Sequence, residues 1–134
     1  MKSVLLLCTG NSCRSQMAEA LLNHHLSDRL RAYSAGTNPQ PKVAEGALEA
    51  LRLAGISVEG LSPKAVERFI TEPIDLVVSV CDNARESCPV FPAPVRQLHL
   101  PFHDPHGEPL DSFVAVRNEI EARLLPAVVK ALEE

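Results

Sequence analysis

Short apolar runs alternate along the chain with longer segments whose apolar residues recur at helical spacing. Residues 3–8 form an apolar run without polar alternation, which is typical of a strand buried on both faces. The pattern then predicts a helix from residue 15 to about residue 27. A second strand is expected near residues 31–35, followed by a helix over residues 43–53 with Gly55 as its C-terminal stop.

The second half of the chain continues the alternation. Pro63 suits the first turn of a short helix that reaches residue 70. Residues 74–80 predict another buried strand, and residues 95–100 predict a weaker one. A closing helix is expected over residues 111–132, interrupted or kinked at Pro126.

This order of elements predicts an α/β fold with a single domain over residues 1–134. Its four-stranded parallel sheet would be flanked by helices and wound as in flavodoxin-like proteins. Ligands of such sheets gather at the carboxyl ends of the strands. Cys8, Cys81 and the loop after Leu100 all follow predicted strands. We therefore expect the functional site at that edge of the sheet.

Composition and charge narrow the possible partners. The 134 residues are 46% hydrophobic and 22% charged, as in ordinary globular proteins. The formal net charge is -4 and no basic block stands out, which argues against nucleic acid and anionic membranes as partners. No apolar run approaches the roughly 18 residues that cross a bilayer. We expect a cytoplasmic protein. Because its surface has no basic block, any anion that it binds must be held by a local binding site.

Residues 8–15, here called the anion loop, join the first predicted strand to the first predicted helix. Backbone N–H groups and the Arg14 guanidinium would surround a tetrahedral oxyanion there. The same groups should lower the pKa of Cys8 and make it nucleophilic. The alternative is a buried Cys8 and a surface Arg14 without a shared function. It does not explain why a buried strand precedes the loop and a helix follows it. The predicted oxyanion-binding residues are Thr9, Gly10, Asn11, Ser12, Cys13, Arg14 and Ser15.

The stretch CTGNSCRSQMAE at residues 8–19, with YSAG at residues 33–36, resembles the thioredoxin-coupled arsenate reductases. They belong to the low-molecular-weight tyrosine phosphatase superfamily, whose phosphate loop is Cys-x5-Arg followed by Ser or Thr. The resemblance covers nearly the whole chain. It implies a phosphatase-like fold, arsenate as substrate, phosphate and sulfate as competing oxyanions, thioredoxin as reductant and no bound cofactor.

Two further cysteines, Cys81 and Cys88, have two competing explanations. They are either buried filler thiols or a resolving pair that removes an adduct from Cys8 by thiol exchange. Parallel strands bring their carboxyl ends together, which places Cys81 within reach of Cys8. The resemblance implies that Cys8 attacks arsenate, Cys81 attacks Cys8, and Cys88 attacks Cys81, with Cys13 as a structural residue. Asp82 and the residues after it predict a short helix that must unwind for a Cys81–Cys88 disulfide.

The resemblance assigns the role of general acid to Asp104, in the loop after the last strand. Taken alone, an aspartate before a proline is more often a turn residue. Three histidines in the same region, His99, His103 and His106, also raise the possibility of zinc. No cysteine spacing completes a four-ligand set, so no metal site is predicted and solvent-exposed histidines are the simpler interpretation.

In some relatives a potassium ion lies behind the phosphate loop. Asn11, Glu19 and Ser34 match three of its side-chain ligands, but the expected aspartate falls near Pro63 and Lys64. One hypothesis is that Lys64 supplies the positive charge itself. The alternative is a solvent-facing lysine in the first turn of a helix.

Three functions remain open at this point. An arsenate-reducing oxidoreductase is the leading interpretation. A phosphatase acting on phosphomonoesters is the second, although His106 and Gly107 stand where many such phosphatases place a tyrosine, and the chain has one Tyr and no Trp. A non-enzymatic oxyanion or redox sensor is the third.

Overall fold

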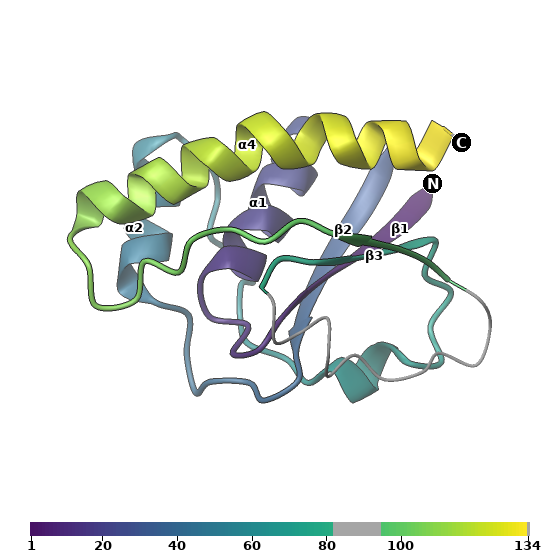
Figure 1. The fold of residues 1–134 in the computed structure, drawn as a ribbon, viewed down its shortest axis with the longest axis horizontal. Helices are drawn as coiled ribbons and strands as arrows, with labels where there is room; N and C mark the ends of the chain where they lie inside the picture. Colours follow the sequence, from purple (N-terminus) through teal and green to yellow (C-terminus); the bar gives the residue numbers. More distant parts are fainter. Residues whose placement is uncertain (82–94, 134) are drawn as a thin grey trace.

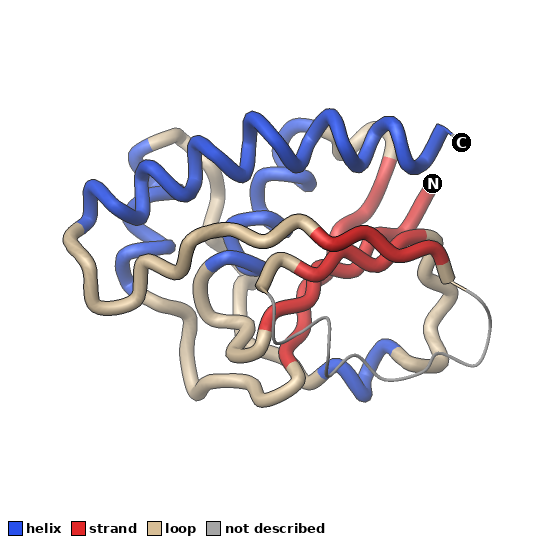
Figure 2. Tube along the Cα trace, in the orientation of Figure 1, coloured by secondary structure: helices blue, strands red, loops and turns tan. Residues whose placement is uncertain are grey.

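The computed structural model describes residues 1–81 and 95–133 (Figures 1 and 2). Cys88 and the helix predicted after Asp82 lie outside the described residues. The elements follow in the order β1 (Lys2–Cys8), α1 (Arg14–His25), β2 (Leu30–Gly36), α2 (Glu45–Leu53), the short 3-10 helix η1 (Val66–Phe69), β3 (Leu76–Ser79), β4 (Arg96–His99) and α4 (Leu110–Glu133).

The four strands form one parallel sheet, as the sequence predicted, and their order is β2-β1-β3-β4. β1 lies at the centre, where Cys8 pairs with Gly36 of β2 and Leu7 pairs with Ser79 of β3. The carboxyl ends of β1, β2 and β3 therefore meet at one edge. This is the edge from which the anion loop leaves the sheet.

The buried side chains form one hydrophobic core around the sheet. Leu5, Leu6 and Leu7 of β1 are fully buried on both faces, which explains an apolar run without alternation. Helices α1, α2 and α4 pack against one another on one side of the sheet, and η1 lies on the other (Figure 1). In the described part of the chain, no helix combines the length and apolar character needed to span a membrane.

Helix α4 runs for 24 residues through Pro126, so an interruption there is wrong, while the alternative, a kink, stays a prediction. Proline removes one hydrogen bond and crowds the preceding turn. Pro126 and Ala122, whose carbonyl loses its partner, both lie exposed, so water can bind that carbonyl. Leu124 and Val128 on either side are fully buried and hold the helix against the core.

The helix predicted from Pro63 is shorter than expected, because η1 begins only at Val66. Lys64 is bound by tertiary contacts instead: its N–H donates to Oδ1 of Asn11 over 2.8 Å, and its carbonyl accepts the N–H of Gly36 over 2.7 Å. Ala65 is extended and bridges Gly36. Lys64 therefore does not occupy a solvent-facing helical turn.

Candidate active site

A cavity of about 800 Å³ opens at the carboxyl ends of β1 and β3. It brings together Cys8, Arg14, Cys81 and Asp104, four of the five residues that the sequence proposes as catalytic; the fifth, Cys88, lies outside the described residues. The other lining residues are Thr9, Gly10, Asn11, Ser12, Cys13, Gln40, Pro41, Lys42, Ala44 and His106. Ser15 is not among them: it is fully buried and bonds Nδ2 of Asn11 through its hydroxyl over 2.8 Å.

All six carbonyls of the anion loop from Cys8 to Cys13 accept a hydrogen bond. Four of these bonds come from backbone amides of residues 37–44, here called the backing segment. In chain order the donors are Thr37 N (3.3 Å), Asn38 N (2.9 Å), Gln40 N (2.8 Å), Gln16 Nε2 (2.8 Å), Ala44 N (2.8 Å) and Met17 N (2.9 Å).

The amide following each carbonyl points the opposite way across a trans peptide. The carbonyls are turned toward these donors, so the amides of the loop face away from them. The described part of the chain offers no backbone acceptor to the amides of residues 10–14. Such a row of unpaired N–H groups at the start of α1 suits an anion.

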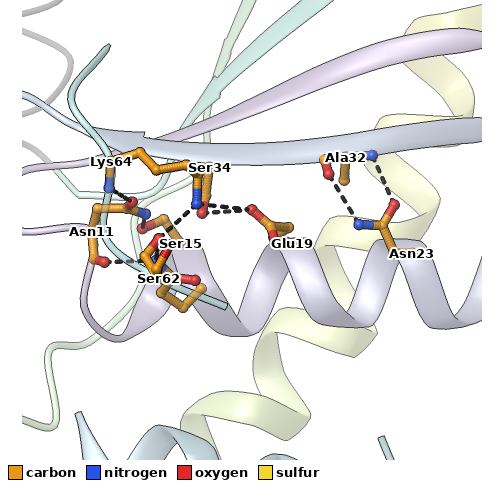
Figure 3. Close-up of polar contacts among 9 residues, drawn as sticks. Asn11, Ser15, Glu19, Asn23, Ala32, Ser34, Ser62 and Lys64 are labelled. Atoms are coloured by element: carbon orange, nitrogen blue, oxygen red, sulfur yellow. Dashed lines mark hydrogen bonds and ion pairs between the residues drawn. The ribbon is translucent and has the colours of Figure 1, made fainter. Parts of the chain in front are cut away.

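Asn11 fixes the bend of the anion loop. Its φ is +48°, a left-handed conformation that asparagine tolerates better than most residues. The buried side chain binds the N–H of Lys64 and the hydroxyl of Ser15, each over 2.8 Å (Figure 3). Nε2 of Gln16 donates a hydrogen bond to the carbonyl of Asn11 and another to the carbonyl of Ser62. The loop is thereby held by α1 and by the segment that leads into η1.

Arg14, the first residue of α1, reaches back over the cavity. Its Nη1 donates to the carbonyl of Phe102 over 3.1 Å, and its Nη2 lies 3.5 Å from Oδ2 of Asp104. The Nε atom is buried and has no hydrogen-bond partner among the described residues. An unpaired buried donor costs about 1–3 kcal/mol. The guanidinium is therefore suited to donate hydrogen bonds to a bound oxyanion.

Asp104 makes the turn contact that the sequence suggested and also lines the cavity. Its Oδ1 accepts the N–H of His106 over 3.0 Å, which is a turn contact, while Oδ2 faces Arg14. The carboxyl group lines the cavity and is half exposed. Its role as general acid stays a prediction.

Cys8 and Cys81 are both buried and reduced, and both line the cavity. Sγ of Cys81 also accepts the N–H of Thr9 over 3.2 Å and lies 3.4 Å from its hydroxyl. The bond to Cys81 and then burial raise the pKa of Cys8, and the charge of Arg14 only partly opposes this. The predicted lowering of the Cys8 pKa is thus wrong for this state, because it left out the second thiol.

Cys13 behaves differently from the thiol pair. Burial, followed by the charge of Asp104, raises its pKa to about 12. Its thiol therefore stays protonated at neutral pH, although it lines the same cavity. This agrees with a structural role.

Behind the anion loop, Lys64 lies beside the residues proposed as potassium ligands (Figure 3). Its Nζ is 3.8 Å from Oε1 of Glu19 and donates to the carbonyl of Ser62 over 2.6 Å. Ser34 donates to the same Glu19 oxygen over 2.8 Å. Burial raises the pKa of Glu19 and lowers that of Lys64, and each charge opposes the shift of the other. The carboxylate of Glu19 thus forms an ion pair with the ammonium group of Lys64.

The three histidines considered for zinc do not converge. His99 bonds the hydroxyl of Ser79 over 2.7 Å, His103 bonds Glu108 over 2.6 Å, and His106 lines the cavity. Within residues 1–81 and 95–133 no three metal-binding side chains gather in one place.

Sequence reasoning missed the backing segment and Phe102. Gln40, Pro41, Lys42 and Ala44 line the cavity, yet none lies in a recognisable catalytic motif. The available signal was the alternation of prolines around Gln40. Phe102 contributes through its backbone, which leaves no signal in its residue type.

The comparisons with known proteins agree with this geometry. A model of the family described as low molecular weight phosphotyrosine protein phosphatase matches residues 3–134. The chain is 37% identical over 123 residues to arsenate reductase 2 of Staphylococcus epidermidis, covering 92% of this chain and 93% of that relative.

Two solved structures extend the comparison. An arsenate reductase of Archaeoglobus fulgidus superposes with a TM-score of 0.79 at 31% identity, over 93% of this chain and 98% of that one. An arsenate reductase in a phosphate-binding state superposes with a TM-score of 0.80 at 28% identity, over 98% and 99% of the two chains. The resemblance drawn from the sequence is confirmed, and the chain belongs to the low molecular weight phosphotyrosine protein phosphatase family.

Proposed function

We propose that this protein reduces arsenate to arsenite through a relay of cysteines and that thioredoxin restores the thiols. The observation that carries the proposal is the position of Cys81, whose Sγ lies 3.2 Å from the amide nitrogen of Thr9, the residue after Cys8, in the cavity that Cys8 and Arg14 also line. Phosphate transfer needs one nucleophile. Reduction also needs two electrons, and two neighbouring thiols supply them when they are oxidised to a disulfide. The related arsenate reductases support the same chemistry.

Arsenate binds first, held by the loop amides and by the guanidinium of Arg14. A tetrahedral dianion satisfies the Nε donor of Arg14, which has no partner among the described residues. Phosphate and sulfate share this shape and charge, so they compete for the site. The relative in a phosphate-binding state supports this assignment.

The first chemical step forms a bond between Sγ of Cys8 and arsenic. The Cys8 proton passes to an arsenate oxygen. One oxygen of arsenate leaves as water, and the carboxyl group of Asp104 supplies a proton for it. Arsenic remains in the pentavalent state at this point.

The second step transfers two electrons. Cys81 gives its proton to an oxygen of the arsenic group, and the resulting thiolate attacks Sγ of Cys8. A disulfide forms, and the sulfur–arsenic bond breaks with its electron pair on arsenic. Arsenic becomes trivalent and arsenite leaves. The Thr9 N–H, 3.2 Å from Sγ of Cys81, stabilises the attacking thiolate.

The third step returns Cys8 to its thiol form. Cys88 attacks Cys81, and the resulting Cys81–Cys88 disulfide is reduced by the dithiol of thioredoxin. The role of Cys88 rests on the family resemblance, since it lies outside the described residues. The overall change is two thiols and arsenate to one disulfide, arsenite and water, which suits a reducing compartment such as the cytoplasm.

Phosphatase activity is the second candidate, because the anion loop, Arg14 and Asp104 serve it equally well. The described lining of the cavity contains no Phe, Tyr or Trp to bind an aromatic ring. Hydrolysis of aryl phosphates should therefore be weak. A sensor without turnover is the third candidate.

One assay separates the three candidates. Arsenate-dependent oxidation of NADPH is measured with thioredoxin and thioredoxin reductase, beside hydrolysis of an aryl phosphate by the same preparation. The proposal predicts oxidation that stops in Cys8→Ser. Aryl phosphate hydrolysis without arsenate-dependent oxidation would identify a phosphatase, and binding of phosphate without either activity would identify a sensor.

A further inference from the structure

The backing segment connects the end of β2 to the start of α2 and runs along the anion loop. Its amides bind the carbonyls of Cys8, Thr9, Gly10 and Ser12, over 2.8 to 3.3 Å. These bonds turn the carbonyls toward the segment, which leaves the loop amides for an anion. The orientation of the anion site therefore depends on the shape of this segment.

The sequence of the segment matches this task. Asn38 and Gln40 each donate an N–H to the anion loop, while Pro39 and Pro41, which have no N–H, follow them. The two donors are two residues apart, and each stands directly before a proline. A proline also restricts the residue before it to extended conformations. Pro39 thus restricts Asn38, and Pro41 restricts Gln40.

The side chain of Gln40 adds a second contact. Its Cγ lies 2.9 Å from the position that a Cβ on Gly10 would take, so it packs directly on the glycine. Neither proline takes part in the bonds that would hold the oxyanion. Pro41 also lines the cavity but has no donor to offer an anion, so the polar effect of both prolines comes through the backbone that they restrict.

We infer that Pro39 and Pro41 are positioning residues for oxyanion binding, because they hold the backing segment in the shape that orients the anion loop. This inference rests on the proposed binding of an oxyanion by that loop. Without the prolines, the segment samples more conformations, and ordering it on binding costs affinity.

The test compares a variant carrying Pro39→Ala and Pro41→Ala with the unmodified protein. Phosphate affinity is obtained from the slowing of Cys8 alkylation as phosphate is added, and KM and kcat are measured with arsenate. We expect the phosphate Kd and the arsenate KM to rise about threefold to tenfold, with kcat changed less than twofold. Pro73→Ala, at an exposed proline before β3, serves as the matched control and should change neither constant.

A second pair of variants isolates the backbone bond. Gln40→Ala removes the side chain and keeps the N–H, whereas Gln40→Pro also removes the donor to Gly10. The Kd of Gln40→Pro should exceed that of Gln40→Ala at least threefold. Unchanged constants in the double proline variant, or a kcat that falls as much as affinity, would overturn the inference while leaving the proposed function intact. Failure of the unmodified protein to bind phosphate would overturn both.

Discussion

The backbone amide of Thr9 donates a hydrogen bond to Sγ of Cys81 over 3.2 Å, although the two residues are 72 positions apart. β1 and β3 are neighbours in the sheet, and both residues directly follow or lie near the ends of these strands. The bond joins the residue after Cys8 to the second thiol. The two sulfur atoms of the proposed relay are thus in place before arsenate binds.

An oxyanion should protect Cys8 from alkylation, because the anion would lie over its sulfur in the cavity. Peptide mapping after treatment with iodoacetamide, with and without saturating sulfate, measures this. Labelling is carried out at alkaline pH, because the bond to Cys81 and burial raise the pKa of Cys8. Equal labelling of Cys8 in the two samples would place the anion elsewhere.

Removing the second thiol should make Cys8 more acidic. The bond from Cys8 to Cys81 is the largest cause of the raised pKa of Cys8, so Cys81→Ala removes that cause and leaves the charge of Arg14. The pKa of Cys8 then falls, and the inflection in its alkylation rate moves to lower pH. An unchanged or higher inflection would show that burial alone sets this pKa.

The activity should not depend on potassium, because the ammonium of Lys64 already faces the carboxylate of Glu19 at 3.8 Å. Arsenate turnover is compared in potassium and tetramethylammonium salts at equal ionic strength. In Lys64→Met the carboxylate loses its counter-charge, and potassium should then raise turnover severalfold. The exposed Lys130→Met is the control. Potassium activation of the unmodified protein would contradict this role of Lys64.

Alanine variants of Gly36 and Gly46 separate an effect on stability from an effect on anion binding. A Cβ on Gly36 would lie 2.6 Å from the carbonyl oxygen of Thr9 and 3.0 Å from Cβ of Asn11, whereas one on Gly46 would lie 2.5 Å from the ring of Phe113. Each alanine variant should lose about 1–3 kcal/mol of unfolding free energy in urea. Only Gly36→Ala should also weaken phosphate binding. Equal phosphate affinity in both variants would show that the anion loop adapts to the added methyl group.

The strands and the site could be predicted because their signals are local or follow from topology. The run before Cys8 is apolar throughout, so a doubly buried central strand was the simplest solution. The rule that parallel strands end at one edge placed Cys81 near Cys8 without any contact being known. The spacing of Cys8 and Arg14, with five loop residues between them, predicted the oxyanion-binding loop.

The errors all come from contacts between distant residues. Lys64 lies outside a helix because Asn11 and Gly36 bind its backbone. The pKa of Cys8 is raised by a thiol that lies far away in the sequence. Helix α4 continues through Pro126 because buried neighbours hold it. Residue types and spacing do not encode such contacts.

The relay is tested most directly by a single turnover of Cys88→Ser with one equivalent of arsenate and no thioredoxin. In this variant the second step can occur but the third cannot. Peptide mass mapping should find a Cys8–Cys81 disulfide, and one arsenite should be released for each disulfide formed. Arsenite release with Cys8 and Cys81 both still reduced, or an intact protein that forms no disulfide while arsenate persists, would contradict the relay.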